Sequence, residues 1–251
     1  MSGHSKWATI KRKKGATDAA RGRLFTRLIK EITIAARQGG GNAQGNPRLR
    51  LAIQTAKDNN MPADNIKRAI QKGTGELPGT TYEEITYEGF APGGVAVLIE
   101  VVTDNPNRTV SEVRHVFSRT NGNMGQKGSV ARLFHKKGTF TVLKSKNKAT
   151  EDDIMAIILD AGAEDMQSDG DDLTITSAPA EFDTVKKALD DHGIVIEHSA
   201  LGMVPETTVK VAGKDAENVL KLMESLEEHD DVQNVYANFD IDEKELASFN
   251  A

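Results

Sequence analysis

The order of hydrophobic periodicities is the feature that most constrains the fold of this chain. Between about residues 136 and 203 the pattern changes in the order strand, helix, strand, strand, helix, strand. The strand segments include GTFTVL (138–143) and the pair AEDMQS and DLTITS, which flank the Asp169-Gly170 turn. A β-α-β-β-α-β order is that of a ferredoxin-like sandwich. We therefore predict an inserted ferredoxin-like α+β domain over residues 135–203.

The segments on both sides of this unit predict a second layer of strands and helices. Residues 81–90 alternate, GGVAVLIEVVT (93–103) has the pattern of a buried strand, and a helix that ends at Gly122 follows. Near the C-terminus, DAENVLKLMESLEEH predicts a helix and VQNVYANFD a strand. Together these segments complete one α+β layer. We predict one discontinuous middle α+β domain, residues 79–134 and 204–251.

Residues 17–78 predict a helical domain of three helices joined by short polar loops. TDAARGRLFTRLIKEITIAARQGGG predicts a long helix that ends at its glycine run, and two shorter helices follow, introduced by Pro47 and Pro62. A three-helix domain of this size is too small to be very stable alone, so we expect it to dock on the rest. The composition of residues 1–16, with little apolar content, predicts a mobile basic arm. The fold class is therefore α+β multidomain.

Charge is divided between the two ends of the chain. The net charge is −5, yet residues 1–80 contain 16 Lys and Arg against 5 Asp and Glu. Residues 150–251 contain 6 against 26. A basic front and an acidic back indicate a nucleic-acid surface at the N-terminal end. An ordinary solvated surface with uneven charge is the alternative.

The long N-terminal helix has a basic side. At about 100° per residue, one side collects four cations within about 40° of its centre line: Arg23, Arg27, Lys30 and Arg37. The opposite side is apolar, and Ile34 interrupts the basic one. The arm places Trp7 among lysines, which suits phosphate neutralisation and base stacking, although Trp7 could instead pack on the helical domain. The predicted nucleic-acid-binding residues are Lys6, Trp7, Lys11, Arg12, Lys13, Lys14, Arg21, Arg23, Arg27, Lys30 and Arg37.

The sequence offers little for catalysis or cofactor binding. It contains no Cys, which excludes disulfides and thiolate zinc sites, and its six His form no ligand pair at a useful spacing. No apolar run approaches the roughly 18 residues of a membrane helix. We expect a cytoplasmic protein that is not an enzyme, binds no metal, cofactor or small-molecule substrate, and does not enter a membrane.

Two turns allow two interpretations each. In NGNMGQKGS (Asn121–Ser129) the glycines are spaced by three, so backbone N–H groups could bind a phosphate, or the segment could be a flexible domain connection. In TDNPNRT (Thr103–Thr109), Asp104 or Asn105 can cap a helix that begins with a proline. We expect Arg108 to point outward from this capped helix.

Several stretches together resemble the YebC/PmpR family. They are GHSKWATIKRKKGATDAARGRLFTRLIKEITIAAR, NPRLRLAIQTAKDNNMPADNIKRAIQKGTG, YEGFAPGGVAVLIEVVTDNPNRT, NGNMGQKGSVARLF and DVQNVYANFD. The resemblance covers essentially the whole chain and departs at Pro106, where a basic residue is common. It implies a three-domain cytoplasmic protein with a helical N-terminal domain and two α/β domains, one inserted in the other. Members are described as transcriptional regulators that bind DNA, and others, including mitochondrial relatives, as translational activators at the ribosome.

One function is preferred and two alternatives stay open. We predict a DNA-binding transcriptional regulator that grips phosphates with the arm and the basic helix. The first alternative is a translation factor whose basic front contacts ribosomal RNA or the ribosome. The second is a protein-interaction adaptor that works through its ferredoxin-like units, with a basic protein partner on its acidic C-terminal half. Cosedimentation with ribosomes and deletion of residues 1–75 would separate the three.

Overall fold

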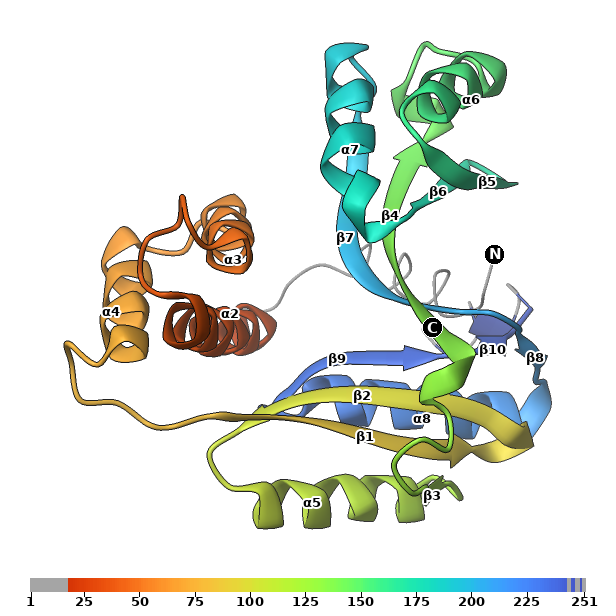
Figure 1. Ribbon diagram of the computed structural model, residues 1–251. Helices are drawn as coiled ribbons and strands as arrows, with labels where there is room; N and C mark the ends of the chain where they lie inside the picture. Colours follow the sequence, from red (N-terminus) through yellow and green to blue (C-terminus); the bar gives the residue numbers. More distant parts are fainter. Residues whose placement is uncertain (1–17, 243–244, 247–248, 250–251) are drawn as a thin grey trace.

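The computed structural model describes residues 18–242, 245, 246 and 249, so the predicted arm lies outside the described residues. Figure 1 shows a group of helices, a mixed layer, and a second mixed layer above it. This arrangement confirms the predicted α+β class. The residue boundaries of the three domains stay as predicted from the sequence.

The helical domain is defined by local signals that start and end its helices and by an apolar core of its own. Asn46 caps the second helix, since its Oδ1 accepts a hydrogen bond from the Leu49 backbone N–H (3.0 Å), and Pro47 takes the first helical position. Gly75 ends the third helix with a left-handed φ of 83°. The core includes Leu28, Ile32, Leu49, Ala56 and Ile66. The helices are α2 (Asp18–Gly39), α3 (Pro47–Asp58) and α4 (Ala63–Thr74).

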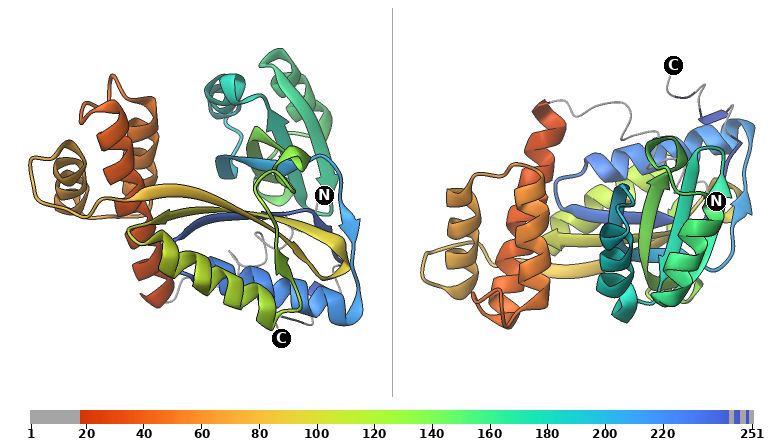
Figure 2. Two further views of the ribbon diagram at one scale, coloured as in Figure 1. Left: turned by 60° about the horizontal axis from the view of Figure 1, so that its bottom comes forward. Right: turned by 90° about the horizontal axis from the view of Figure 1, so that it is seen from above.

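The middle domain is a sheet in the order β3-β1-β2-β9 with two helices on one face (Figures 1 and 2). Asn105 caps the first of these helices by accepting from the Arg108 backbone N–H (3.1 Å), as predicted. Strands and helices on both sides of the insertion share one apolar core. The elements are β1 (Glu83–Ala91), β2 (Val95–Thr103), α5 (Pro106–Arg119), β3 (Asn123–Met124), α8 (Gly213–Glu228) and β9 (Val232–Ala237). Sequence analysis missed β8 (Val209–Lys210), and it merged β10 (Phe239–Asp240), the parallel partner of β8, with β9 in one predicted strand.

The insertion has the predicted β-α-β-β-α-β order and forms an antiparallel sheet in the order β5-β6-β4-β7. Its helices pack on the sheet through a separate core that includes Phe140, Ile158, Leu173 and Val185. The elements are β4 (Phe134–Leu143), α6 (Glu151–Asp160), β5 (Ala163–Asp169), β6 (Asp172–Ser177), α7 (Phe182–Asp191) and β7 (Ile196–Pro205). The ferredoxin-like prediction is confirmed.

The face of the middle sheet away from α5 and α8 is covered unevenly. An apolar cluster joins Leu98 of β2 to Val130 and Phe134 at the entry to the insertion, with Met203 and Tyr236 packed against it. Farther along β2 the same face borders a cleft. Among the described helices, none is long and apolar enough to cross a membrane.

Candidate nucleic-acid interface

Lys30, on the basic side of α2, is buried. Its side chain is 8% exposed, and its Nζ lies 2.7 Å from Oδ1 of Asp231. The same Nζ donates to the backbone oxygens of Asp230 (2.9 Å) and Val102 (3.3 Å) and lies 5.7 Å from the centre of the Tyr82 ring. The prediction that Lys30 belongs to an exposed basic stripe is therefore wrong, because an acidic side chain of the middle domain neutralises it.

Arg23 and Arg27 contact the C-terminal end of α8. Arg27 donates to the backbone oxygen of Glu227, and a guanidinium nitrogen of Arg23 lies 3.4 Å from Oε1 of Glu228. A helix C-terminus carries unpaired carbonyls and a partial negative charge, so it attracts cations. Most of the basic side of α2 is thus a docking surface for the middle domain.

Two sequence features are consistent with this docking. Ile34 lies on the basic side of α2 and is 4% exposed, as an interface residue would be. The run EEHDD (227–231) supplies the acidic partner. Neither feature identifies the pairing, because Lys30 and Asp231 are 201 positions apart.

Arg21 and Arg37, near the two ends of α2, remain exposed. Arg37 donates a hydrogen bond to Oγ1 of Thr81 (3.3 Å), and Arg21 forms no ion pair with a described residue. The other predicted residues lie outside the described part of the chain: Lys6, Trp7, Lys11, Arg12, Lys13 and Lys14. Their contact with nucleic acid stays a prediction.

Asp231 is the centre of a polar network between α2, β2 and α5. Besides the ammonium group of Lys30, its carboxylate accepts hydrogen bonds from Thr103 (3.0 Å), Thr109 (2.7 Å) and Arg108 (2.7 Å). Burial by itself would raise the pKa of Asp231, but these hydrogen bonds, that of Lys30 first, outweigh burial and hold the pKa well below its usual range. Arg108 is exposed, as expected, but its guanidinium is held by this network, since it pairs with Asp231 and Asp104.

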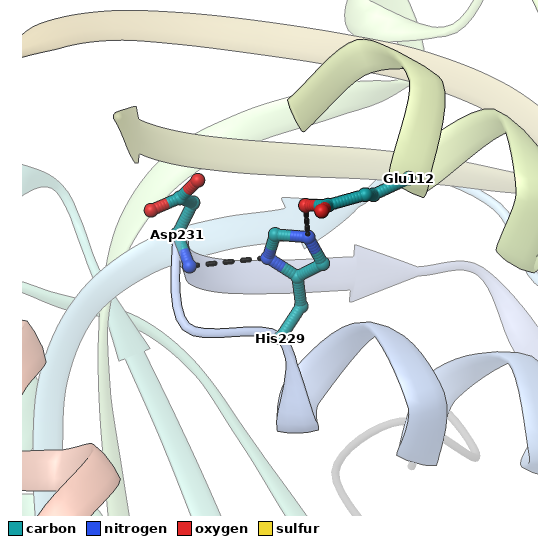
Figure 3. Close-up of side chains that lie close together, drawn as sticks. All are labelled: Glu112, His229 and Asp231. Carbon is teal, nitrogen blue, oxygen red and sulfur yellow. Dashed lines mark hydrogen bonds and ion pairs between the residues drawn. The ribbon is translucent and has the colours of Figure 1, made fainter. Parts of the chain in front are cut away.

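His229 and Glu112 adjoin Asp231 (Figure 3). Nε2 of His229 lies 2.9 Å from Oε2 of Glu112, and Nδ1 accepts from the Asp231 backbone N–H (3.1 Å). The three side chains could offer a metal donor atoms within 4.8 Å of one another. However, Nδ1 of His229 and the Asp231 carboxylate already accept the hydrogen bonds just described. We interpret the cluster as a hydrogen-bond network beside the ion pairs of Asp231, and the absence of a metal stays an expectation.

The glycine loop after α5 surrounds a carboxylate of the protein itself. The backbone N–H groups of Gly128, Val130 and Ala131 donate to Glu88, at 2.6, 2.6 and 2.8 Å. Burial would raise the pKa of Glu88, but the three donors together lower it. These donors are therefore not available to a phosphate, which favours the domain-connection interpretation of residues 121–129.

Comparisons with known proteins place this architecture in a family. The model of the TACO1/YebC protein N-terminal domain matches residues 5–76, and that of the TACO1/YebC second and third domain matches residues 82–239. The chain belongs to the TACO1/YebC family.

Relatives and a solved structure agree with this membership. A "Probable transcriptional regulatory protein" of Solibacter usitatus is 58% identical over 250 residues and covers all of both chains. One of the same name from Pelodictyon phaeoclathratiforme is 54% identical over 251 residues, again over all of both chains. The crystal structure of a conserved hypothetical protein from Aquifex aeolicus matches with a TM-score of 0.80 and 48% identity, covering 90% of this chain and 93% of that one.

In this TACO1/YebC chain, a cleft of about 860 Å³ lies between the helical domain and the insertion. Its floor is the sheet face away from α5 and α8, and its walls are α3 and α7, which stand on opposite sides of the strands (Figures 1 and 2). Arg50 and Leu51 line it from α3, and Lys186 lines it from α7. Leu51 is 45% exposed, whereas the other large apolar residues described in the helical domain are buried or half-buried.

The acidic side chains on the floor of the cleft have internal partners. Arg48 lies 2.7 Å from Glu31 and 2.5 Å from Glu84, and hydrogen bonds to these two carboxylates raise the pKa of its guanidinium. Asn234 donates to Glu100 (2.8 Å). Tyr236 also donates to Glu100 (3.3 Å), and burial, followed by this carboxylate, raises the pKa of the phenol, so it stays protonated.

Proposed function

We propose that this TACO1/YebC chain is a DNA-binding regulatory protein that holds phosphates with its basic arm and with the exposed cations of its helical domain. The names of its relatives support a role in transcriptional regulation. The arm supports phosphate contact, since Lys6 and the run Lys11–Lys14 are accompanied by no acidic residue within residues 1–15.

The surface charge of the helical domain is the observation that carries the proposal. Docking on the middle domain engages Arg23, Arg27 and Lys30. Besides Arg50, which lines the cleft and is not assigned to duplex contact, a larger set of cations remains exposed: Arg21, Arg37, Lys57, Lys67, Arg68 and Lys72. The exposed carboxylates described on this domain are Asp58, Asp64 and Glu76. A surface with this excess attracts a polyanion, whereas the acidic C-terminal half repels it and orients the protein.

The docking geometry changes which predicted residues should touch DNA. We assign phosphate contact to the arm, Arg21 and Arg37. Trp7 would stack on a base if the arm meets an unpaired one. Arg23, Arg27 and Lys30 hold the helical domain in place, so reversing their charge would test docking and not DNA contact.

The arm is tested by charge reversal at Lys11, Arg12 and Lys13. Fluorescence anisotropy with a labelled DNA duplex, repeated across a salt series, measures affinity and its salt dependence. We expect K11E/R12E/K13E to weaken binding strongly and to make the slope of log K against log salt shallower. The slope should change by about 0.9 for each phosphate that the variant no longer neutralises.

A control variant with the same change in net charge separates loss of the arm contacts from a general charge effect. K148E/K187E/K210E makes the same charge change at exposed lysines of the acidic half that form no ion pair with a described residue. If both triple variants bind DNA alike, specific contact by the arm is refuted. Cosedimentation of the arm variant with ribosomes tests the translation-factor alternative, which would hold if ribosome binding, and not DNA binding, depends on the arm.

A further inference from the structure

The cleft between α3 and α7 carries cations that take no part in domain docking. Arg50 comes from α3, Lys136 from β4 and Lys186 from α7, so both walls contribute. None of the three forms an ion pair with a carboxylate among the described residues, and each is exposed or half-buried. Asp183 is the one nearby wall carboxylate that is likewise without an ion pair in the described chain.

The floor offers hydrogen-bonding groups held in fixed positions. Glu84 accepts hydrogen bonds from Arg48 and Gln38, and Glu100 accepts from Asn234 and Tyr236. Each carboxylate has room for more than the bonds it makes, because two oxygens provide about four lone-pair sites. Beside them, the Gln233 amide nitrogen is buried and has no acceptor among the described residues. A rotation of this side chain toward a bound acceptor would satisfy it.

The size of the cleft limits its occupant. A volume of about 860 Å³ falls within the range of about 300–1,000 Å³ typical of small-ligand pockets. This space suits a few nucleotides of one strand and is too small for a double helix. The DNA duplex proposed for the arm therefore cannot occupy it.

We infer that the cleft binds a short segment of single-stranded nucleic acid. Phosphates lie against Arg50, Lys136 and Lys186 at the rim. The bases turn toward the floor, where Glu84 and Glu100 accept hydrogen bonds from their amino groups. A single strand leaves the Watson–Crick edges free for such contacts, and carboxylates accept well from cytosine N4.

This inference rests on the proposed function, since it assigns a second surface to a nucleic-acid-binding protein. An acidic peptide would also suit the rim cations. The floor favours nucleotides, because its carboxylates would repel the side chains of an acidic peptide but accept hydrogen bonds from base amino groups.

The rim is tested with R50E/K136E/K186E in the full chain. The probes are fluorescein-labelled 12-nucleotide single strands, one DNA and one RNA, and a labelled DNA duplex. We expect at least a tenfold loss of affinity for a single strand. The salt slope should become shallower by about 2, since each phosphate neutralised on a single strand contributes about 0.7. Duplex affinity should stay within twofold.

The control K148E/K187E/K210E carries the same charge change and should keep single-strand affinity. Equal single-strand affinity of the rim variant and this control would overturn the inference. Circular dichroism checks that both variants are folded, as expected for substitutions that break no ion pair.

Photocrosslinking gives an independent measurement of position. A p-benzoylphenylalanine in place of Leu51, which is 45% exposed in the cleft, should crosslink to the single strand. The same group in place of Leu159 of α6, which is 59% exposed and does not line the cleft, should not. Equal crosslinking at both positions would contradict a cleft site. Crosslinks from Leu51 to a peptide, with none to a single strand, would assign the cleft to a protein partner and overturn the inference.

The two proposals fail separately. If K11E/R12E/K13E binds duplex DNA normally but the rim variant loses the single strand, the arm proposal is wrong and the cleft inference stands. If the arm variant loses the duplex but the rim variant keeps the single strand, the cleft inference is wrong and the arm proposal stands.

Discussion

The middle domain holds its two neighbours by different physics. The helical domain is attached through charged and polar contacts, namely Lys30 with Asp231, Arg23 and Arg27 with the end of α8, and Arg48 with Glu84. The insertion is attached by the two chain segments that enter and leave it and by an apolar cluster around Leu98 and Phe134. The four apolar clusters of the described residues include none that joins the helical domain to the middle domain.

Because of this difference, the two attachments should respond differently to salt and to pH. Exposed ion pairs weaken with salt, and any ion pair weakens when its carboxylate is protonated, whereas apolar burial depends little on either. The helical domain also has its own core and an exposed connection to β1 through residues 75–81. We therefore expect the helical domain to separate from the middle domain more readily than the insertion, which should separate only when the apolar cluster is disrupted.

The largest expected effect is that of Asp231→Asn. Removing one partner of a buried pair typically costs about 3–5 kcal/mol, because the other charge stays buried without compensation. Lys30 escapes that state if the helical domain undocks. We expect faster proteolysis within residues 75–81 and a larger radius of gyration, with the insertion unchanged. Asp183→Asn, an exposed site without an ion pair to a described residue, is the control, and equal proteolysis in both variants would contradict the docking role.

The same ion pair predicts a pH dependence of docking. The folded-state pKa of Asp231 lies below its unfolded value, which is near 3.9 for a free aspartate. Its stabilisation is therefore complete above about pH 4 and is lost as the pH falls through the lower folded value. Proteolysis of residues 75–81 in the wild type should rise on acidification below about pH 4. The Asp231→Asn variant should lack this acid-induced rise in proteolysis. An identical pH profile of the two proteins would refute a role of Asp231 in the pH dependence of docking.

Phe134→Ala tests the apolar attachment. Phe134 is 5% exposed in its cluster, and truncation of a buried phenylalanine costs about 3–5 kcal/mol. We expect a loss near the lower end, about 3 kcal/mol, since the cluster is small and close to the cleft. Urea unfolding should give the same loss at low and high salt. A loss that depends on salt as strongly as that of the docking variants would remove the contrast between the two attachments.

Arg48→Gln should give the smallest effect. Its pairs with Glu31 and Glu84 are half exposed, and such pairs contribute about 0–1 kcal/mol each. We expect a slight increase in proteolysis of residues 75–81 at low salt that disappears near 1 M salt, where screening acts over about 3 Å. Arg68→Gln, on the same domain but without an ion pair to a described residue, is the control. A salt-independent effect would indicate that Arg48 acts through packing.

The fold was largely predictable because its signals are local. Asn46-Pro47 and Asn105-Pro106 mark helix starts wherever they occur, and alternation between strand and helix periods revealed the insertion. The short strand β8 was missed, because two residues carry too little periodicity to detect. Phe239–Asp240 were assigned to one strand with Val232–Ala237, although the structure divides them into β9 and β10.

The candidate site was less predictable. The helical wheel correctly grouped Arg23, Arg27 and Lys30 on one side of α2, but it could not tell whether that side met solvent or another domain. Ile34 was the local sign of an interface. The cleft left no local signal, since Arg50, Lys136 and Lys186 come from segments that the fold alone brings to one space.

The sequence by itself determined the type and order of the elements, the insertion of one domain in another, and a basic N-terminal end followed by an acidic C-terminal one. These follow from capping, periodicity and composition, which act over a few residues or over the whole chain. Only the tertiary structure decided which cations stay exposed, because Lys30 meets Asp231 across 201 positions of sequence. Such a pairing depends on how the domains pack, and no local pattern encodes it.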